Sequence, residues 1–157
     1  MNIFVFDQDF TTNAQYHCDK HVVKMITEYA QLLSGAVRST GVDAGYKQTH
    51  MSHPCAIWAR FSIENYEWLC KLTIAVHKEW QYRYNHPANH YHKAFKVAAL
   101  LPWPELPSRG MTPFAQAMPS EYSIPHNAIT AYRNYFNGEK QHIASWTNRN
   151  QPEWYHE

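Results

Sequence analysis

Five polar residues suited to acid–base or metal chemistry recur every three to four positions near the start of the chain. They are His17, His21, Lys24, Glu28 and Gln31. At about 3.6 residues per turn, this spacing places all five on one narrow face of a helix. Apolar residues occupy the neighbouring face, so the polar stripe is predicted to follow the border between core and solvent. A cleft wall would lie there.

Three interpretations of this stripe stay open. His17 and His21 are four residues apart and spaced to bind a divalent metal, with Glu28 as a third ligand or as a base. In the second interpretation no metal is needed: a histidine and Glu28 act as acid and base, while Lys24 and an arginine hold an anion. The third is an ordinary solvated helix face, where His–Glu and Lys–Glu neighbours are common.

Further candidates lie outside the stripe. His53 directly precedes Pro54, so its ring is expected near the amino end of a helix, where backbone N–H groups favour anions. Capping or packing at a turn is the alternative for His53. Cations beside flat rings suit a phosphate and a stacked base, although such an arginine also often extends from a half-buried helix to solvent. The candidate substrate-binding residues are Lys24, Arg60, Tyr132, Arg133 and Lys140.

Helices must position these residues, and the apolar spacing predicts where they run. Helical regions are expected over residues 13–36, from residue 54 with a new cap at Ser62, over 63–84, over about 89–101, and from 125 to 146 with a bend at 137–138. Residues 2–6 are β-prone but alone, so any strand there is short or merely extended. Six of the nine prolines fall within 102–125, which predicts an irregular segment lying across the helices.

These patterns predict a mainly α protein, a compact single-domain bundle of three to five helices over residues 1–157 with a Pro-rich irregular segment. The hydrophobic fraction of 45% and aromatic fraction of 15% exclude a disordered chain. Fourteen basic and thirteen acidic residues leave a charge of +1, which provides no large basic field for gripping duplex DNA. No Walker loop, Gly-x-Gly-x-x-Gly or Gly-x-Ser-x-Gly occurs, which disfavours kinases, Rossmann oxidoreductases and α/β-hydrolases.

The same composition bears on compartment. No apolar run approaches the ~18 residues of a membrane span, so no membrane partner is expected. The amino-terminal residues lack the basic and apolar regions of a signal peptide. Cys18, Cys55 and Cys70 are odd in number and form no Cys-x-x-Cys pair, as expected for reduced thiols in a cytoplasmic protein.

Nearly the whole chain resembles a family of small tailed-phage proteins. The resemblance is carried by Met-Asn-Ile-Phe at residues 1–4, His-Cys-Asp-Lys-His-Val-Val-Lys-Met at 17–25, Glu-Tyr-Ala-Gln-Leu-Leu at 28–33, His-Pro at 53–54, Trp-Ala-Arg at 58–60, Gln-Ala-Met-Pro at 116–119, Ala-Tyr-Arg-Asn-Tyr at 131–135 and Pro-Glu-Trp at 152–154. It implies a phage setting, and with it the cytoplasm of the infected bacterial host.

A second, more remote similarity is to phage pyrimidine-dimer DNA glycosylases of the endonuclease V type, compact helical domains of nearly this length. It rests on the order and spacing of residues 21–28, 118–122, 125–129, 139–140 and 152–155. The resemblance implies an active-site histidine at His21, a catalytic glutamate at Glu28 and DNA contacts at Arg133 and Lys140.

This chain departs from that family at its amino end. The family attacks the sugar with the free amine of a small residue that is exposed when Met1 is removed. Here residue 2 is Asn, whose side chain is large for the usual aminopeptidase. Met1 is therefore expected to stay, and the amine is expected to lie one residue out of place. Ile3 stands where the family has a basic residue.

Together these features predict an enzyme that cleaves a phosphodiester or N-glycosidic bond in a nucleotide or nucleic acid by His/Glu acid–base chemistry. Glu28 is the expected base, and His17, His21 and His53 the expected proton carriers. The low net charge favours a small substrate, such as a cyclic-nucleotide defence messenger. One alternative is a pyrimidine-dimer-type glycosylase and AP lyase in DNA repair, and another is a non-enzymatic module that binds a nucleotide or a host protein. The cofactor is expected to be none, or a divalent metal at His17 and His21.

Overall fold

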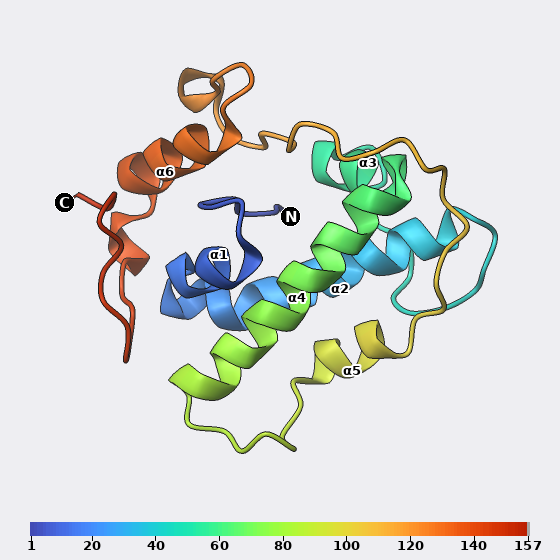
Figure 1. Ribbon diagram of the computed structural model, residues 1–157, viewed down its shortest axis with the longest axis horizontal. Helices are drawn as coiled ribbons and strands as arrows, with labels where there is room; N and C mark the ends of the chain where they lie inside the picture. The colour runs from blue at the N-terminus through green and yellow to red at the C-terminus, as the bar shows by residue number, and fades with distance from the viewer. Residues whose placement is uncertain (157) are drawn as a thin grey trace.

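The computed structural model describes residues 1–156, which form six α-helices and two short 3-10 turns without any β-strand (Figure 1). The elements are α1 (Phe10–Tyr16), α2 (Asp19–Arg38), α3 (Pro54–Phe61), α4 (Ile63–Arg83), α5 (Lys93–Ala99), η1 (Ser120–Tyr122), α6 (Ala128–Glu139) and η2 (Gln141–Ile143). The mainly α prediction is confirmed. The helix count exceeds the expected three to five, because the first expected helix is divided into two.

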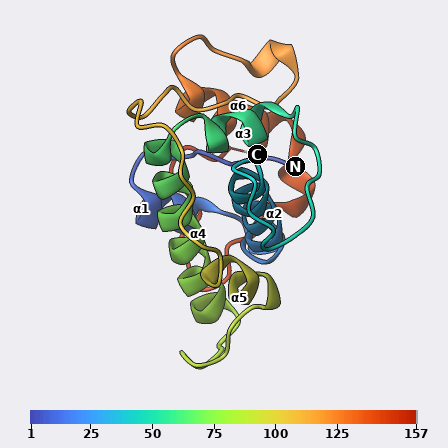
Figure 2. The same cartoon turned by 90° about the vertical axis from the view of Figure 1, so that its right-hand side faces the viewer.

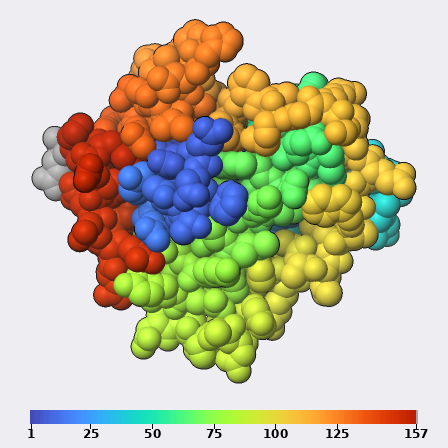
Figure 3. Space-filling view, in the orientation of Figure 1, coloured from blue at the N-terminus to red at the C-terminus, as the bar shows by residue number. Residues whose placement is uncertain are grey.

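The long helices α2 and α4 pack against each other and form the centre of the molecule. α1 lies against α4, α3 lies against both long helices, and α5 lies against α2. α6 and the carboxyl-terminal segment lie across the amino-terminal segment from this group (Figures 1 and 2). The space-filling view shows the amino-terminal residues enclosed between α6, the carboxyl-terminal segment and α4 (Figure 3). Segments from the two ends of the chain therefore meet at one place.

The helix expected over residues 13–36 is wrong at one point, because the chain breaks at His17 and Cys18, which are both extended. Tertiary contacts explain the break. The buried guanidinium of Arg83 donates to the carbonyl oxygens of His17 and Gln15, and the amide of Asp19 donates to Ser145 O at 2.8 Å. These partners replace hydrogen bonds that a continuous helix would make. His17 is thereby removed from the helix that carries the rest of the polar stripe.

Residues 2–6 are extended and buried, without a neighbouring strand. The sequence predicted either a short strand or a merely extended segment here, and the second is found. Side chains satisfy their backbone instead. The amide of Phe4 donates to Tyr29 Oη at 3.3 Å. Asn13 accepts from the amide of Phe6 at 2.9 Å and donates to Phe4 O at 3.0 Å. Because buried backbone groups need partners, these side chains hold the segment in one position.

The remaining helix predictions differ from the structure mainly at their ends. The Ser62 cap is confirmed, with Ser62 Oγ accepting from the amide of Asn65 at 3.1 Å, and α4 ends one residue before the expected end. α5 is shorter than the expected 89–101, and α6 ends at Glu139 rather than bending at 137–138. The Pro-rich segment lies along α3 and α4 as expected (Figure 2). Glu64 anchors it by accepting from the amides of Arg109 and Gly110.

The two long helices are amphipathic rather than apolar throughout. α2 spans 20 residues and α4 spans 21, and each carries charged side chains along its solvent-facing side. Within residues 1–156, none of the helices combines the length and the mean hydropathy that a membrane span requires.

Candidate active site

A cavity of about 210 Å³ lies where the amino terminus meets α2 and the end of α6. We call it the Glu28 pocket. Its lining comes from three parts of the chain: Met1, Asn2 and Phe4; His21, Lys24, Met25 and Glu28 on α2; and Ala117, Tyr135 and Lys140. Four of the nine predicted site residues line it, namely His21, Lys24, Glu28 and Lys140.

The centre of the Glu28 pocket is a carboxylate between two amines. The α-amine of Met1 lies 3.0 Å from Glu28 Oε1, and Lys24 Nζ lies 3.9 Å from Glu28 Oε2. The Glu28 side chain is 12% exposed and that of Met1 is 4% exposed, whereas Lys24 is largely in solvent. The Met1 ammonium therefore compensates most of the charge that Glu28 brings into this partly buried site.

His21 forms one wall of the pocket, and its surroundings keep the ring neutral. The ring is 5% exposed and stacks on Phe4 with 4.2 Å between ring centroids. The pKa of His21 is lowered to about 3, mainly by burial and in addition by electrostatic repulsion from His17, Lys140 and Lys24. Within residues 1–156, its buried Nδ1 atom has no hydrogen-bond partner. A neutral imidazole supplies no charged acid near neutral pH.

Aromatic rings and a second lysine complete the pocket. Tyr135 lies nearly parallel to Phe4, at 10° between the ring planes and 6.4 Å between centroids. Lys140 follows the last residue of α6, and its Nζ atom lies 5.4 Å from the centroid of the Tyr135 ring. Lys140, Lys24 and the Met1 amine together outnumber Glu28, so the pocket favours an anionic group.

His53 lies beside the pocket and also caps a helix. Its Nδ1 accepts from the amide of Cys55 at 3.0 Å at the start of α3, so a neutral ring carries its proton on Nε2. Burial lowers the pKa of His53, and the nearby positive charge of the Met1 amine and His50 lowers it further, while Glu28 raises it. The charges of the Met1 amine and of Glu28 therefore act on the pKa of His53. Its ring takes the helix N–H site that was expected to bind an anion.

His17 lies outside the pocket and is completely buried. Its Nδ1 lies 2.7 Å from Asn13 O and its Nε2 lies 2.7 Å from Tyr29 Oη. Because the carbonyl only accepts, Nδ1 carries the proton and the Tyr29 hydroxyl donates to Nε2. Burial lowers the pKa of His17 to about 4, which outweighs the opposing bond to Asn13. His17 thus stabilises the core and is not placed to transfer protons to a substrate.

The structure does not favour a metal at His17 and His21. Both nitrogens of His17 have partners within the protein, and the chain break takes His17 out of the α2 face that carries His21. Across residues 1–156, no group of three or more His, Cys, Asp or Glu side chains is arranged to hold a metal ion.

Three predicted substrate-binding residues lie outside the Glu28 pocket and make bonds within the fold. Arg60 donates to Met51 O at 2.7 Å. Arg133 donates to Phe6 O at 2.9 Å, and its guanidinium lies over the ring of Trp154. The Tyr132 hydroxyl is buried and lies 2.8 Å from Asn2 Oδ1. Side-chain spacing within one helix does not reveal such distant acceptors.

The sequence predicts that the amine of a retained Met1 lies one residue out of place relative to the glycosylase family, and in the structure this amine lies 3.0 Å from Glu28 Oε1. Phe4 and Tyr135 were also missed as pocket walls. The sequence feature that points to the Met1 amine is the size of Asn2, which predicts that Met1 is kept. Where the resulting amine lies depends on the path of residues 2–6.

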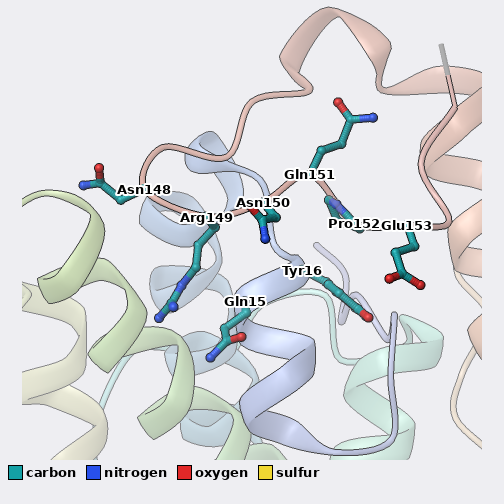
Figure 4. Close-up of a pocket in the computed structure, with 8 residues that line it drawn as sticks. All are labelled: Gln15, Tyr16, Asn148, Arg149, Asn150, Gln151, Pro152 and Glu153. Carbon is teal, nitrogen blue, oxygen red and sulfur yellow. The ribbon is translucent and has the colours of Figure 1, made fainter.

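A larger cavity, of about 680 Å³, lies between the end of α1 and residues 148–153 (Figure 4). None of the predicted site residues lines it. Arg149 extends from this segment toward α4 (Figure 4), where it binds both carboxylate oxygens of Glu79. The cation of this cavity is therefore already paired, and we place the candidate site in the smaller Glu28 pocket on the basis of its chemistry.

Comparison of the chain with protein-family models, with curated proteins and with solved structures found no match.

Proposed function

We propose that the Glu28 pocket is an active site that cleaves a C–N glycosidic bond in a nucleotide or nucleic acid, with the Met1 α-amine as nucleophile. The observation that carries this proposal is the 3.0 Å pair of the Met1 amine and Glu28 Oε1 inside a polar cavity. An amine held against a carboxylate is a nucleophile with its own base. The sequence-based alternative of a glycosylase and AP lyase is thereby favoured over pure His/Glu acid–base chemistry.

The reaction begins when Glu28 accepts a proton from the Met1 ammonium. The neutral amine attacks C1′ of the sugar, a new N–C1′ bond forms, and the C1′–base bond breaks with its electron pair leaving on the base. One amine proton goes to the departing base. The second goes by way of Glu28 to the ring oxygen as the sugar ring opens, which leaves an imine. Water then adds to the imine and releases the aldehyde sugar and the free amine.

The neighbouring side chains have supporting roles in this proposal. Lys24 and Lys140 bind phosphate next to the sugar, since both cations lie at the same pocket as Glu28. His21 contributes a neutral ring to the pocket wall. Tyr135, which is partly exposed, presents a flat face on which a base or sugar can pack. The surplus of positive charge supports a phosphate-bearing substrate.

Borohydride trapping tests the proposal directly, since only an amine nucleophile gives a reducible imine. The protein is incubated with oligonucleotides that carry an abasic site or damaged pyrimidines, reduced, and examined for a covalent adduct by mass spectrometry. Peptide mapping is expected to place the adduct on Met1. Intact mass first establishes that the purified chain carries Met1 with an unblocked amine.

Two variants make the test specific. Two residues added before Met1, or Glu28→Gln, should reduce trapping by at least about 100-fold. Glu67→Gln is the matched control, because Glu67 pairs with Lys71 at 3.5 Å in the same i, i+4 arrangement on the exposed side of α4. This variant should form as much trapped adduct as the wild type. Adduct formation on a lysine, or full trapping by the extended chain, would contradict the proposal.

The small volume of the pocket favours a second candidate, a hydrolase of small or cyclic nucleotides that uses Glu28 as base. A cavity of about 210 Å³ suits one nucleotide unit better than a stretch of duplex. This candidate predicts turnover of cyclic dinucleotides, read by mass spectrometry, with no borohydride adduct and no loss on extending the amino terminus.

A further inference from the structure

Asn2 lies at the junction of three segments that are distant in sequence. Its Oδ1 accepts from the amide of Ile3 at 2.8 Å and from the Tyr132 hydroxyl on α6 at 2.8 Å. Its Nδ2 donates to Ala117 O at 2.9 Å. The thiol of Cys55 on α3 lies 3.6 Å from the same Oδ1. The residue is only 9% exposed, and both Oδ1 and Nδ2 bond to other parts of the protein.

The partner groups of Asn2 are themselves held. The Tyr132 hydroxyl also accepts from the amide of Ala117 at 3.2 Å, which closes a ring of bonds between α6, Ala117 and Asn2. Burial raises the pKa of Tyr132 well above its usual value, so the hydroxyl keeps its proton, which faces Asn2 Oδ1 at 2.8 Å and Ala115 O at 2.9 Å. Buried polar networks with every member satisfied are rigid. The backbone at residue 2 is therefore fixed on both sides.

We propose that Asn2 is a positioning residue that holds the Met1 amine against Glu28 and also keeps Met1 on the chain. The amine is one residue beyond the anchored position, so it has little freedom to leave the pocket. A small residue at position 2 would make none of these bonds and would allow the usual aminopeptidase to remove Met1. One side chain thus determines both which amine is present and where it lies. This inference rests on the proposed function.

Asn2→Leu is the main test, because leucine is of similar size, keeps Met1 and makes none of the hydrogen bonds. Tyr132→Phe removes one bond to Asn2 from the other side. Ile3→Val is the matched control, since it trims a buried side chain next to Asn2 without changing a polar contact. Intact mass checks Met1 in every variant, and Asn2→Ala is expected to lose it.

The first readout needs no substrate. Reductive methylation with formaldehyde and cyanoborohydride is followed at Met1 by mass spectrometry, with exposed Lys71 as internal standard. The Met1 amine is paired with Glu28 at 3.0 Å, so we expect slow methylation in wild type and Ile3→Val. Asn2→Leu should react several-fold faster, and Tyr132→Phe should lie between them. Equal rates in wild type and Asn2→Leu would overturn the positioning role.

The second readout is imine trapping under the conditions above. The rate of trapping is measured over a range of substrate concentrations. Asn2→Leu is expected to lower kcat by at least about 10-fold with KM within about three-fold, because a misplaced nucleophile slows the reaction without weakening substrate binding. Unchanged kcat would overturn the inference even where the proposed function stands. If the wild type forms no adduct, the proposed function fails, and the methylation rates still decide whether Asn2 positions the amine.

Discussion

Two carboxylates of this protein lie away from bulk solvent between two cations, and they differ in the cations that surround them. Glu79 on α4 is 4% exposed and is bound by Arg83 Nε at 2.8 Å and by Arg149 Nε and Nη2 at 2.8 and 3.1 Å. Glu28 on α2 faces an α-amine at 3.0 Å and a solvent-exposed lysine at 3.9 Å, and it borders a cavity.

The difference shows why one carboxylate stabilises the fold and the other is a candidate for chemistry. Guanidinium groups stay protonated and bind carboxylates through a fixed fork of donors, so neither Arg83 nor Arg149 can become a nucleophile. An α-amine loses its proton far more readily than a lysine or an arginine, and its neutral form attacks carbon. The type of cation therefore separates the two sites more clearly than burial does.

Replacing Glu79 should have the largest effect on stability. Glu79→Gln leaves the fully buried guanidinium of Arg83 without its main counter-charge, and breaking such a pair costs about 3 kcal/mol or more. Glu28→Gln should cost clearly less, because Met1 borders the cavity and water there can solvate its amine. Urea denaturation of both variants measures this difference. Equal losses of stability would remove the distinction drawn between the two sites.

Acid should have the next largest effect on stability, through His17 and His21. The pKa of His17 is lowered to about 4 and that of His21 to about 3, whereas both titrate near 6.5 in the unfolded chain. Below pH 6.5 the unfolded state binds protons that the folded state does not. The free energy of unfolding should therefore fall, by about 2 kcal/mol for each histidine at pH 5, and stay level above pH 7.

His21→Phe isolates one part of this acid sensitivity. Phenylalanine can keep the stack on Phe4 and cannot be protonated, so the variant should lose less stability between pH 7 and pH 5 than the wild type. Thermal melts across that range measure the effect. Parallel melting curves for the two proteins would show that His21 is not held neutral by burial.

Removing Lys24 should have the smallest effect on stability. Lys24 is 73% exposed and 3.9 Å from Glu28, and exposed ion pairs contribute little, so Lys24→Ala should change stability by less than about 0.5 kcal/mol. Its expected effect is a higher KM for phosphate-bearing substrates, with kcat nearly unchanged. A stability loss as large as that of Glu79→Gln would mean that Lys24 supports the fold.

Local patterns were sufficient for most of the fold. The apolar spacing of residues 63–84 and the Ser62 cap predicted α4 to within one residue at each end. The i, i+3 and i+4 spacing of His21, Lys24 and Glu28 correctly placed them on one side of α2. The periodicity could not reveal the break at His17, because hydrogen bonds from Arg83, 66 residues away, replace those of the helix there.

The sequence by itself determined the helices, the polar face of α2 and the large residue at position 2, since each depends on neighbours within a few residues. Only the tertiary structure decided that the Met1 amine lies on Glu28, that His17 is a core residue and that Arg133 binds Phe6 O. These outcomes depend on the path of residues 2–6 between α2 and α6. That path is set by side-chain hydrogen bonds from Asn13, Tyr29 and Tyr132, which span 9 to 130 positions.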